Sequence, residues 1–283
     1  MNTLYLSVCL VVMLAIRKSR SFTLLFLPWF LFGIIYTAMG FFPNYNVNPI
    51  DVGPIYHLEK EWFGISASSA DLSAAAELCK GSALAIFESG KLIPGEYFAV
   101  HHWGWADLLA GLFYLCWVPV PFLFTLYLYI KKEYGWMQRF AWCFLFVNLI
   151  GFVIYYIHPA SPPWYAMNYG FDAVLGTPGN TAGLGRFDEL IGMKVFGSIY
   201  GQNANVFAAV PSLHAAYMLI ATVYAVISGR KWYTCCLFAF ICLGIWWTAV
   251  YTGHHYIVDV ILGVITAIVG ISIFEGVYKL VKP

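Results

Sequence analysis

Four ionisable residues stand at the starts of two apolar segments in the last third of the chain. One segment begins AVPSLHAAYMLI (209–220), and the other begins TGHHYIVD (252–259). Ionisable groups inside membrane helices cost about 2.5–3.5 kcal/mol on insertion scales and are usually functional. A single histidine of this kind is often a satisfied residue at a helix interface, but two such segments favour a shared site. The four residues are His214, His254, His255 and Asp259.

The spacing in the second segment separates its two histidines. His255 and Asp259 are four residues apart and share one face of a helix. The carboxylate can therefore accept the Nδ1–H of the ring and leave Nε2 free as a nucleophile. His254 is five residues from Asp259 and is rotated away by about 140°. We predict His255 and Asp259 as catalytic residues and His254 as a polar residue that lines the site or packs beside it.

Histidines at helix starts are well placed for phosphoryl transfer. The first turn of a helix presents unpaired N–H groups and a positive dipole end, which favour a phosphate group. One histidine can attack phosphorus while His214, on the facing helix, protonates the leaving alkoxide and then deprotonates the incoming nucleophile. The alternative is a metal site made of the same nitrogen and oxygen ligands. The sequence has no HExxH, no HxxHH and no carboxylate cluster, so we expect no metal and no cofactor.

The composition is that of an integral membrane protein. Of 283 residues, 61% are hydrophobic and only 10% are charged, whereas a soluble domain has about 25% charged residues. The mean hydropathy is +0.74. The net charge of +1 lacks the basic excess of nucleic-acid-binding proteins, so we expect no nucleic-acid partner. Most of the seven cysteines fall in apolar runs, where they act as small hydrophobic residues rather than as a disulfide framework.

Seven apolar runs are candidates for helices that cross the membrane. A spanning helix needs about 17–25 residues, so the first run is marginal. Its positive charges follow the apolar stretch, which argues against a signal peptide. The expected fold class is all-α, a polytopic membrane bundle of six or seven helices in one domain, 1–283. The runs are 3–16, 21–42, 105–130, 140–157, 213–228, 232–250 and 256–278.

Basic residues in the short loops set the expected orientation. Under this threading most of the fifteen Lys and Arg residues fall on one side, which is cytoplasmic. The long segments 43–104 and 158–211 then face the outside or the lumen. We expect one or two helices lying against the membrane in the first, and an ordered irregular cap in the second. The basic residues on that side are Arg17, Lys18, Arg20, Lys131, Lys132, Arg139, Arg230, Lys231, Lys279 and Lys282.

The sequences of these motifs resemble those of a known family. VPSLHAA (210–216) and YTGHHYIVDVILG (251–263) resemble the second and third signature motifs of the type-2 phosphatidic acid phosphatase, or lipid phosphate phosphatase, superfamily. HPASPPWYAMNYG (158–170) and GLGRFDELIG (183–192) resemble its inositol phosphorylceramide synthase branch, the fungal aureobasidin-resistance enzymes. The resemblance covers about 150–283, while the first half agrees mainly in hydropathy.

The resemblance implies a six-helix membrane core with its site facing the lumen or periplasm. It also implies a ping-pong transfer in which His255 forms a phosphohistidine and Asp259 orients its ring. His214 would be the acid and base for the departing diacylglycerol and then for ceramide. The implied partners are therefore lipids: a phosphatidylinositol-type donor, ceramide, the diacylglycerol product and the membrane itself.

Two elements of the superfamily pattern are missing. Lys132 and Arg139 have the Lys-x6-Arg spacing of the first motif, but Phe140 replaces its proline, and the threading puts them on the cytoplasmic side. Thr248 and Ala249 occupy the places of the Ser-Arg pair in the third motif, an arginine that the synthase branch also lacks. Phosphate neutralisation must therefore come from other groups.

Other residues of the outer segments are candidates for binding the substrate. Arg186, Lys194 and the backbone of 159–163 can neutralise phosphate, although Arg186 can instead pair with Asp188. The aromatic pair after the prolines can line a headgroup pocket or anchor the membrane interface. The substrate-binding candidates are Ser212, Arg186, Trp164, Tyr165 and His254.

Three functions are open at this point. The first is a phosphotransferase that moves inositol phosphate from phosphatidylinositol, or a related donor, to ceramide. The second is a lipid phosphate phosphatase, with water as the acceptor. The third is a non-enzymatic lipid binder or transporter that uses the histidines as a proton relay, and it is disfavoured because the sequence indicates no broken-helix pairs and no inverted repeats.

Overall fold

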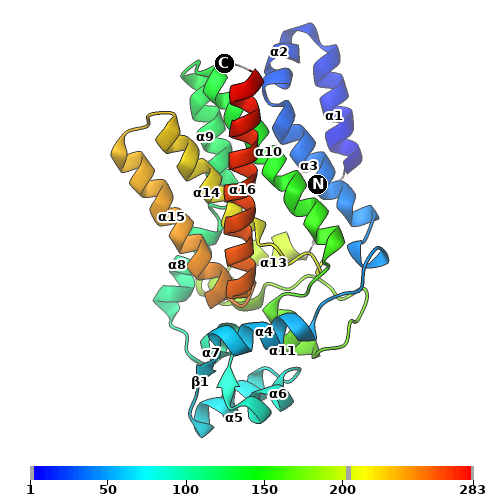
Figure 1. Ribbon diagram of the computed structural model, residues 1–283, viewed down its shortest axis with the longest axis vertical. Coiled ribbons are helices and arrows are strands. Elements are labelled where there is room, and N and C mark those ends of the chain that lie inside the picture. Colours follow the sequence, from blue (N-terminus) through cyan, green and yellow to red (C-terminus); the bar gives the residue numbers. More distant parts are fainter. Residues whose placement is uncertain (1–2, 202–204, 282–283) are drawn as a thin grey trace.

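The computed structural model describes residues 3–201 and 205–281, so Lys282 of the predicted basic set lies outside the described residues. Figure 1 shows long helices bundled together, with short elements gathered at one end. The bundle contains α1 (Thr3–Ala15), α2 (Arg17–Leu25), α3 (Leu27–Ala38), α8 (Gly104–Tyr114), α9 (Pro119–Ile130), α10 (Tyr134–Ile157), α14 (Leu213–Ile227), α15 (Trp232–Tyr251) and α16 (Ile257–Val281).

The short elements form a cap at that end of the bundle. They include two short antiparallel strands, in which Ile65 pairs with Leu92 and Ser66 with Lys91. The cap elements are η1 (Met39–Phe41), η2 (Asn44–Asn46), α4 (Gly53–Phe63), β1 (Ile65–Ser66), α5 (Ser69–Leu78), α6 (Ala83–Ser89), β2 (Lys91–Leu92), α7 (Pro94–Val100), α11 (Pro163–Tyr169), η3 (Ala182–Leu184), α12 (Gly185–Ile191) and α13 (Val195–Tyr200).

Six apolar segments of the bundle match the predicted spans. α10, α15 and α16 are each long and apolar enough to cross a membrane, and the pairs α2–α3 and α8–α9 pass the same test when each bent pair is taken as one span. α14 is apolar but shorter. The predicted all-α polytopic membrane bundle is therefore confirmed. The marginal first run is the 13-residue helix α1, which packs along α2 and α3 (Figure 1).

Two predicted spans are broken rather than straight. The α2–α3 pair bends by 74° and the α8–α9 pair by 43°. Proline explains both positions, because Pro28 and Pro119 stand in the first turn of the second helix of each pair, where a missing N–H is tolerated but a preceding helix cannot continue. The expectation that the chain has no broken-helix pairs is wrong, and that ground for disfavouring a transporter disappears.

Lipid-facing surface accounts for the apolar residues that the core does not bury. Val153 on α10 is 58% exposed, Phe240 on α15 is 61% exposed and Ile268 on α16 is 53% exposed. Large apolar side chains exposed along several helices would be a liability in water, but they are what a bilayer requires. The protein is therefore an integral membrane protein.

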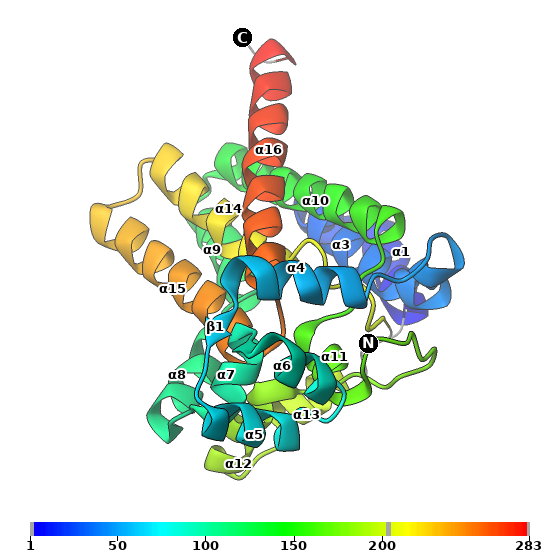
Figure 2. The same cartoon turned by 60° about the horizontal axis from the view of Figure 1, so that its bottom comes forward.

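The basic loops and the cap lie at opposite ends of the bundle. In Figure 1 the α1–α2, α9–α10 and α14–α15 connections lie near the C-terminus, away from the cap. Segment 43–104 contains more structure than the predicted one or two helices, namely α4 to α7 and the two strands. Segment 158–211 was predicted to be irregular, yet its described residues include the short α-helices α11, α12 and α13. Figure 2, with the cap turned forward, shows α4 lying across the start of α16.

Candidate active site

The two predicted catalytic histidines meet where α14 and α16 begin. His214 lies in the first turn of α14, and His255 lies just before α16. His214 Nδ1 is 3.0 Å from His255 Nε2, and His255 Nδ1 is 3.3 Å from Asp259 Oδ2. With Nδ1–H of His255 donated to the carboxylate, Nε2 carries the lone pair and accepts Nδ1–H of His214. The three side chains form one chain of hydrogen bonds, and its His255–Asp259 link is the contact predicted from the four-residue spacing.

A close backbone approach fixes the start of α14 against α16. The Ser212 backbone N–H donates to the Asp259 carbonyl at 2.9 Å, and the Ser212 hydroxyl caps α14 by accepting from Ala215 N. A Cβ on Gly263 would lie 2.1 Å from the Ser212 carbonyl oxygen, so only glycine permits this approach. The structure thus engages Ser212 in positioning His214, and its predicted contact with substrate remains a prediction.

The turn before α16 is held by backbone hydrogen bonds. Gly253 has φ of +69°, a left-handed conformation that favours glycine, and its carbonyl accepts from Trp164 N at 3.1 Å. His255 N donates to the Ala249 carbonyl at 2.9 Å. Asp259 Oδ2 also accepts from Tyr256 N at 3.0 Å. These bonds set the direction in which the His255 ring projects.

His254 lines the same cavity as the catalytic pair. Its ring lies between those of Tyr114 and Tyr200, with centroids 5.5 and 4.6 Å away. Burial, together with the charge of His255, lowers the pKa of His254 to about 3. The ring is therefore neutral near pH 7 and can exchange hydrogen bonds with a substrate, but it supplies no positive charge for a phosphate.

Three neighbouring cavities share residues at this site. A small cavity of about 60 Å³ is lined by the three histidines, Trp164 and Asn180. A second cavity of about 360 Å³ shares His214 and runs along mainly apolar and aromatic side chains of α3, α10, α13 and α14. A third, more polar cavity of about 210 Å³ shares Trp164 and Asn180 and is lined by Arg186. The histidines therefore stand between an apolar space and a polar one.

Arg186 is held at the polar cavity by an acidic partner that the sequence did not reveal. Its Nε donates to Asp107 Oδ1 at 2.7 Å, and Tyr251 donates its hydroxyl to the same oxygen at 2.9 Å. The buried Nη2 has no hydrogen-bond partner among the described residues. The alternative pairing with Asp188 is wrong, because that carboxylate accepts from the backbone of Phe196 and Gly197.

The other residues predicted to bind substrate differ in where they lie relative to the cavities. Trp164 is 6% exposed and lines two of the cavities. Tyr165 is buried and holds the following loop, accepting from Val174 N and donating to the Asp172 carbonyl, and it lines none of these three cavities. Lys194 is exposed.

The backbone N–H groups of 159–163 and the Lys132–Arg139 pair do not contribute to the site. The N–H groups of Ala160 and Ser161 donate to Phe207 and Asp51 carbonyls, so they are not available to a phosphate. Arg139 lies at the opposite end of the bundle and forms an ion pair with Glu275 near the end of α16. The interpretation of that basic pair as topology charge agrees with this position.

Comparison with known proteins identifies the family. The PAP2 superfamily model matches residues 95–273. The chain belongs to the PAP2 superfamily. This PAP2 match begins well before 150, where the motif resemblance started, and includes all four ionisable residues of the site. No solved structure matches the chain.

Relatives place this PAP2 chain in the synthase branch predicted from the motifs. A phosphoinositol dihydroceramide synthase of Bacteroides thetaiotaomicron is 55% identical over 96% of this chain and 82% of its own length. The inositol phosphorylceramide synthase catalytic subunit of Schizosaccharomyces pombe is 35% identical over 55% of this chain and 38% of its own length. That of Saccharomyces cerevisiae is 28% identical over 53% and 39%. The chain spans well under half the length of these two fungal relatives.

Proposed function

We propose that this protein transfers inositol phosphate from a phosphatidylinositol-type donor to the primary hydroxyl of a ceramide-type lipid. The observation that carries the proposal is the Asp259–His255–His214 chain of hydrogen bonds, which stands between an apolar and a polar cavity. The names of the relatives support the same donor and acceptor classes. The apolar cavity at His214 favours a lipid hydroxyl over water as acceptor.

The donor lies across the three cavities. Its inositol occupies the polar cavity beside Arg186, whose unpartnered Nη2 donates to the phosphate or to a ring hydroxyl. Its phosphate reaches the small cavity at His255, and its glycerol and acyl chains lie in the apolar cavity beside His214. Trp164 lines the passage between phosphate and ring.

In the first step the Nε2 lone pair of His255 attacks phosphorus. The bond between phosphorus and the diacylglycerol oxygen breaks, and His214, protonated on both ring nitrogens at this stage, gives its Nδ1 proton to that oxygen and becomes neutral. Asp259 stabilises the positive charge that develops on the His255 ring by accepting its Nδ1–H. The result is an inositol-phosphohistidine and free diacylglycerol.

In the second step the ceramide hydroxyl occupies the place that diacylglycerol left. Nδ1 of His214, now without its proton, accepts the hydroxyl proton as the oxygen attacks phosphorus. The P–N bond breaks and its electron pair returns to His255. Both histidines end in their starting protonation states, so the cycle balances.

The catalytic end faces the lumen or periplasm in this account. The support is the distribution of charge, because basic residues gather in the short connections at the opposite end and such residues stay in the cytoplasm. Donor, acceptor and products are all membrane lipids, which matches a site bordered by lipid-facing helices.

One assay tests the proposal. Purified protein is incubated with inositol-labelled phosphatidylinositol, with and without ceramide, and the labelled products are identified. The expected product is an inositol-phospholipid that forms only with ceramide, together with stoichiometric diacylglycerol. Labelled inositol phosphate released at equal rates without ceramide would instead identify water as the acceptor, as in the hydrolytic alternative, and no turnover with either would support a lipid binder or transporter.

A further inference from the structure

Helix α16 is capped by a carboxylate from a distant part of the chain. Glu59 on α4 accepts from Ile257 N at 2.8 Å and from Val258 N at 3.2 Å, and these are the first two N–H groups of the helix. Helix starts are usually capped by Ser, Thr, Asp or Asn just before the first turn, but Tyr256 stands there. A residue 198 positions away performs this task.

Glu59 occupies an environment that a carboxylate tolerates poorly. It is 1% exposed. Its pKa is raised to about 7, chiefly by burial and also by the Asp259 carboxylate, against the lowering effect of the two backbone N–H groups. The positive end of α16 offsets part of the cost of the charge. A buried acid beside a second buried acid is costly to retain for packing alone, which indicates a specific task at the helix start.

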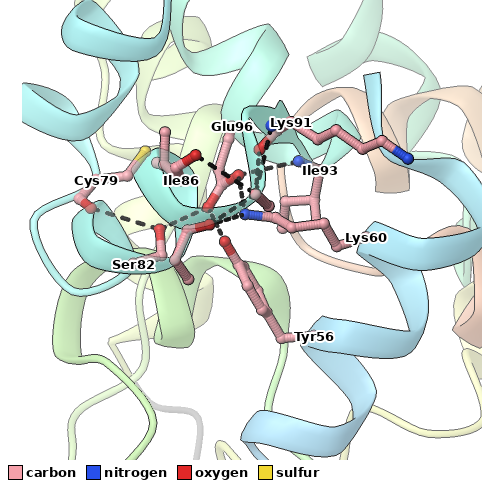
Figure 3. Close-up of polar contacts among 10 residues, drawn as sticks. Tyr56, Lys60, Cys79, Ser82, Ile86, Lys91, Ile93 and Glu96 are labelled. Carbon is pink, nitrogen blue, oxygen red and sulfur yellow. Dashed lines mark hydrogen bonds and ion pairs between the residues drawn. The ribbon is translucent and has the colours of Figure 1, made fainter. Parts of the chain in front are cut away.

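The neighbouring residue, Lys60, joins α4 rigidly to the rest of the cap. Its Nζ lies 3.6 Å from Glu96 Oε2, and both side chains are almost fully buried. Glu96 also accepts from Tyr56 and Ser82 hydroxyls at 2.7 and 2.5 Å, and from Ile93 N at 2.9 Å. Figure 3 shows these groups converging on the carboxylate. Because Glu59 is adjacent to Lys60 in sequence, this network fixes the position of α4 against the start of α16.

The two N–H groups that donate to Glu59 lie, in the sequence, between the proposed catalytic residues His255 and Asp259. His255 precedes Ile257 by two residues, and Asp259 follows Val258 directly. A shift of this short segment changes both the 3.3 Å contact of His255 with Asp259 and the direction of Nε2. Misplacement of reacting groups by about 1 Å can lower a rate by about 10²-fold.

We propose that Glu59 is a positioning residue for phosphoryl transfer, which fixes the start of α16 so that His255 and Asp259 face His214. The proposal rests on the proposed roles of those three residues. It assigns a task to segment 43–104, most of which precedes the region matched by the PAP2 model: the segment is the rigid support of the nucleophile.

Two variants of similar length separate positioning from packing. Glu59→Gln keeps an acceptor oxygen at the end of the side chain, whereas Glu59→Met fills the space without one. Glu61→Met is the matched control, because Glu61 lies on the same helix and is exposed. Transfer kinetics are measured per folded protein, with the folded fraction taken from thermal unfolding of the purified samples.

The expected result is a kcat for Glu59→Gln within about 5-fold of the parent and a kcat for Glu59→Met lower by about 10²-fold, with little change in donor KM. Glu61→Met should match the parent. Equal kcat values for Glu59→Gln and Glu59→Met overturn the proposal. If Glu59→Met does not fold, Glu59→Asp replaces it, because the shorter side chain keeps the charge but moves the carboxylate away from the N–H groups of α16. An unchanged kcat for Glu59→Asp also overturns the proposal. A parent protein without transfer contradicts the proposed function itself, which distinguishes the two failures.

Discussion

The Nδ1 atom of His214 lies 3.0 Å from Nε2 of His255, although the two residues are 41 positions apart, one in the first turn of α14 and the other just before α16. This contact makes the histidines a proton-sharing pair, with Asp259 on the far side of His255. In-line attack requires phosphorus to lie between Nε2 and the leaving oxygen, so the two rings separate when a donor enters. The hydrogen bond therefore defines the resting position from which both catalytic roles begin.

The first prediction concerns which of the two adjacent histidines is the nucleophile. His255→Ala removes the nucleophile, His214→Ala removes the proton carrier, and Asp259→Asn removes the group that sets the His255 tautomer. Each variant should lower the transfer rate by about 10²-fold or more. His254→Ala should keep more activity than any of them, because its ring lines the cavity but does not join the hydrogen-bonded chain. The initial rate of inositol-phospholipid formation checks the order. An active His255→Ala with an inactive His254→Ala contradicts the assignment.

The second prediction concerns the close approach of α16 to the Ser212 turn. Gly263→Ala puts a Cβ 2.1 Å from a backbone oxygen, so the two helix starts must move apart, at a cost of about 1–3 kcal/mol. Both thermal stability and transfer should fall, because His214 moves relative to His255. Gly276→Ala is the control on the same helix, where nothing lies within 4 Å. If both variants behave alike, the approach does not set the site.

The third prediction concerns the headgroup cavity. Arg186→Met removes the unpartnered Nη2 donor and the arginine partner of Asp107. The KM for phosphatidylinositol should therefore rise by about 10-fold or more, the worth of one hydrogen bond to a charged group. Lys194→Met serves as control and tests the rival cation. The measurement is donor KM at saturating ceramide. A larger effect from Lys194→Met than from Arg186→Met would move the headgroup to another surface.

Much of the site could be predicted from local spacing. His214, His255 and Asp259 stand in short motifs, and the predicted contact between the His255 ring and the Asp259 carboxylate is present. The expected shared helix face is not, because His255 lies in the turn before α16. Prolines 28 and 119 marked the bends in two spans and were a usable signal, because proline in the first turn of a helix ends what precedes it.

Contacts between distant segments could not be predicted from one sequence. Glu59 and Asp107 bear on the site only through tertiary structure, across 198 and 79 positions. Neither stands in a motif. Glu59 lies in the long segment 43–104, where an acidic residue is usually solvated, and Asp107 lies near the start of the predicted span 105–130 without indicating its partner. Arg186 has a nearer acid at Asp188, so local spacing favoured the wrong partner. Folding decided the pairing, since Asp188 is used to hold the start of α13.

The stereochemical course at phosphorus distinguishes transfer through a phosphohistidine from direct transfer between the two lipids. A phosphatidylinositol phosphorothioate of one defined configuration at phosphorus is converted with ceramide, and the configuration of the product is determined. Transfer through His255 involves two successive in-line displacements, so overall retention is expected. Inversion would mean a single direct attack by ceramide and would contradict a phosphohistidine intermediate.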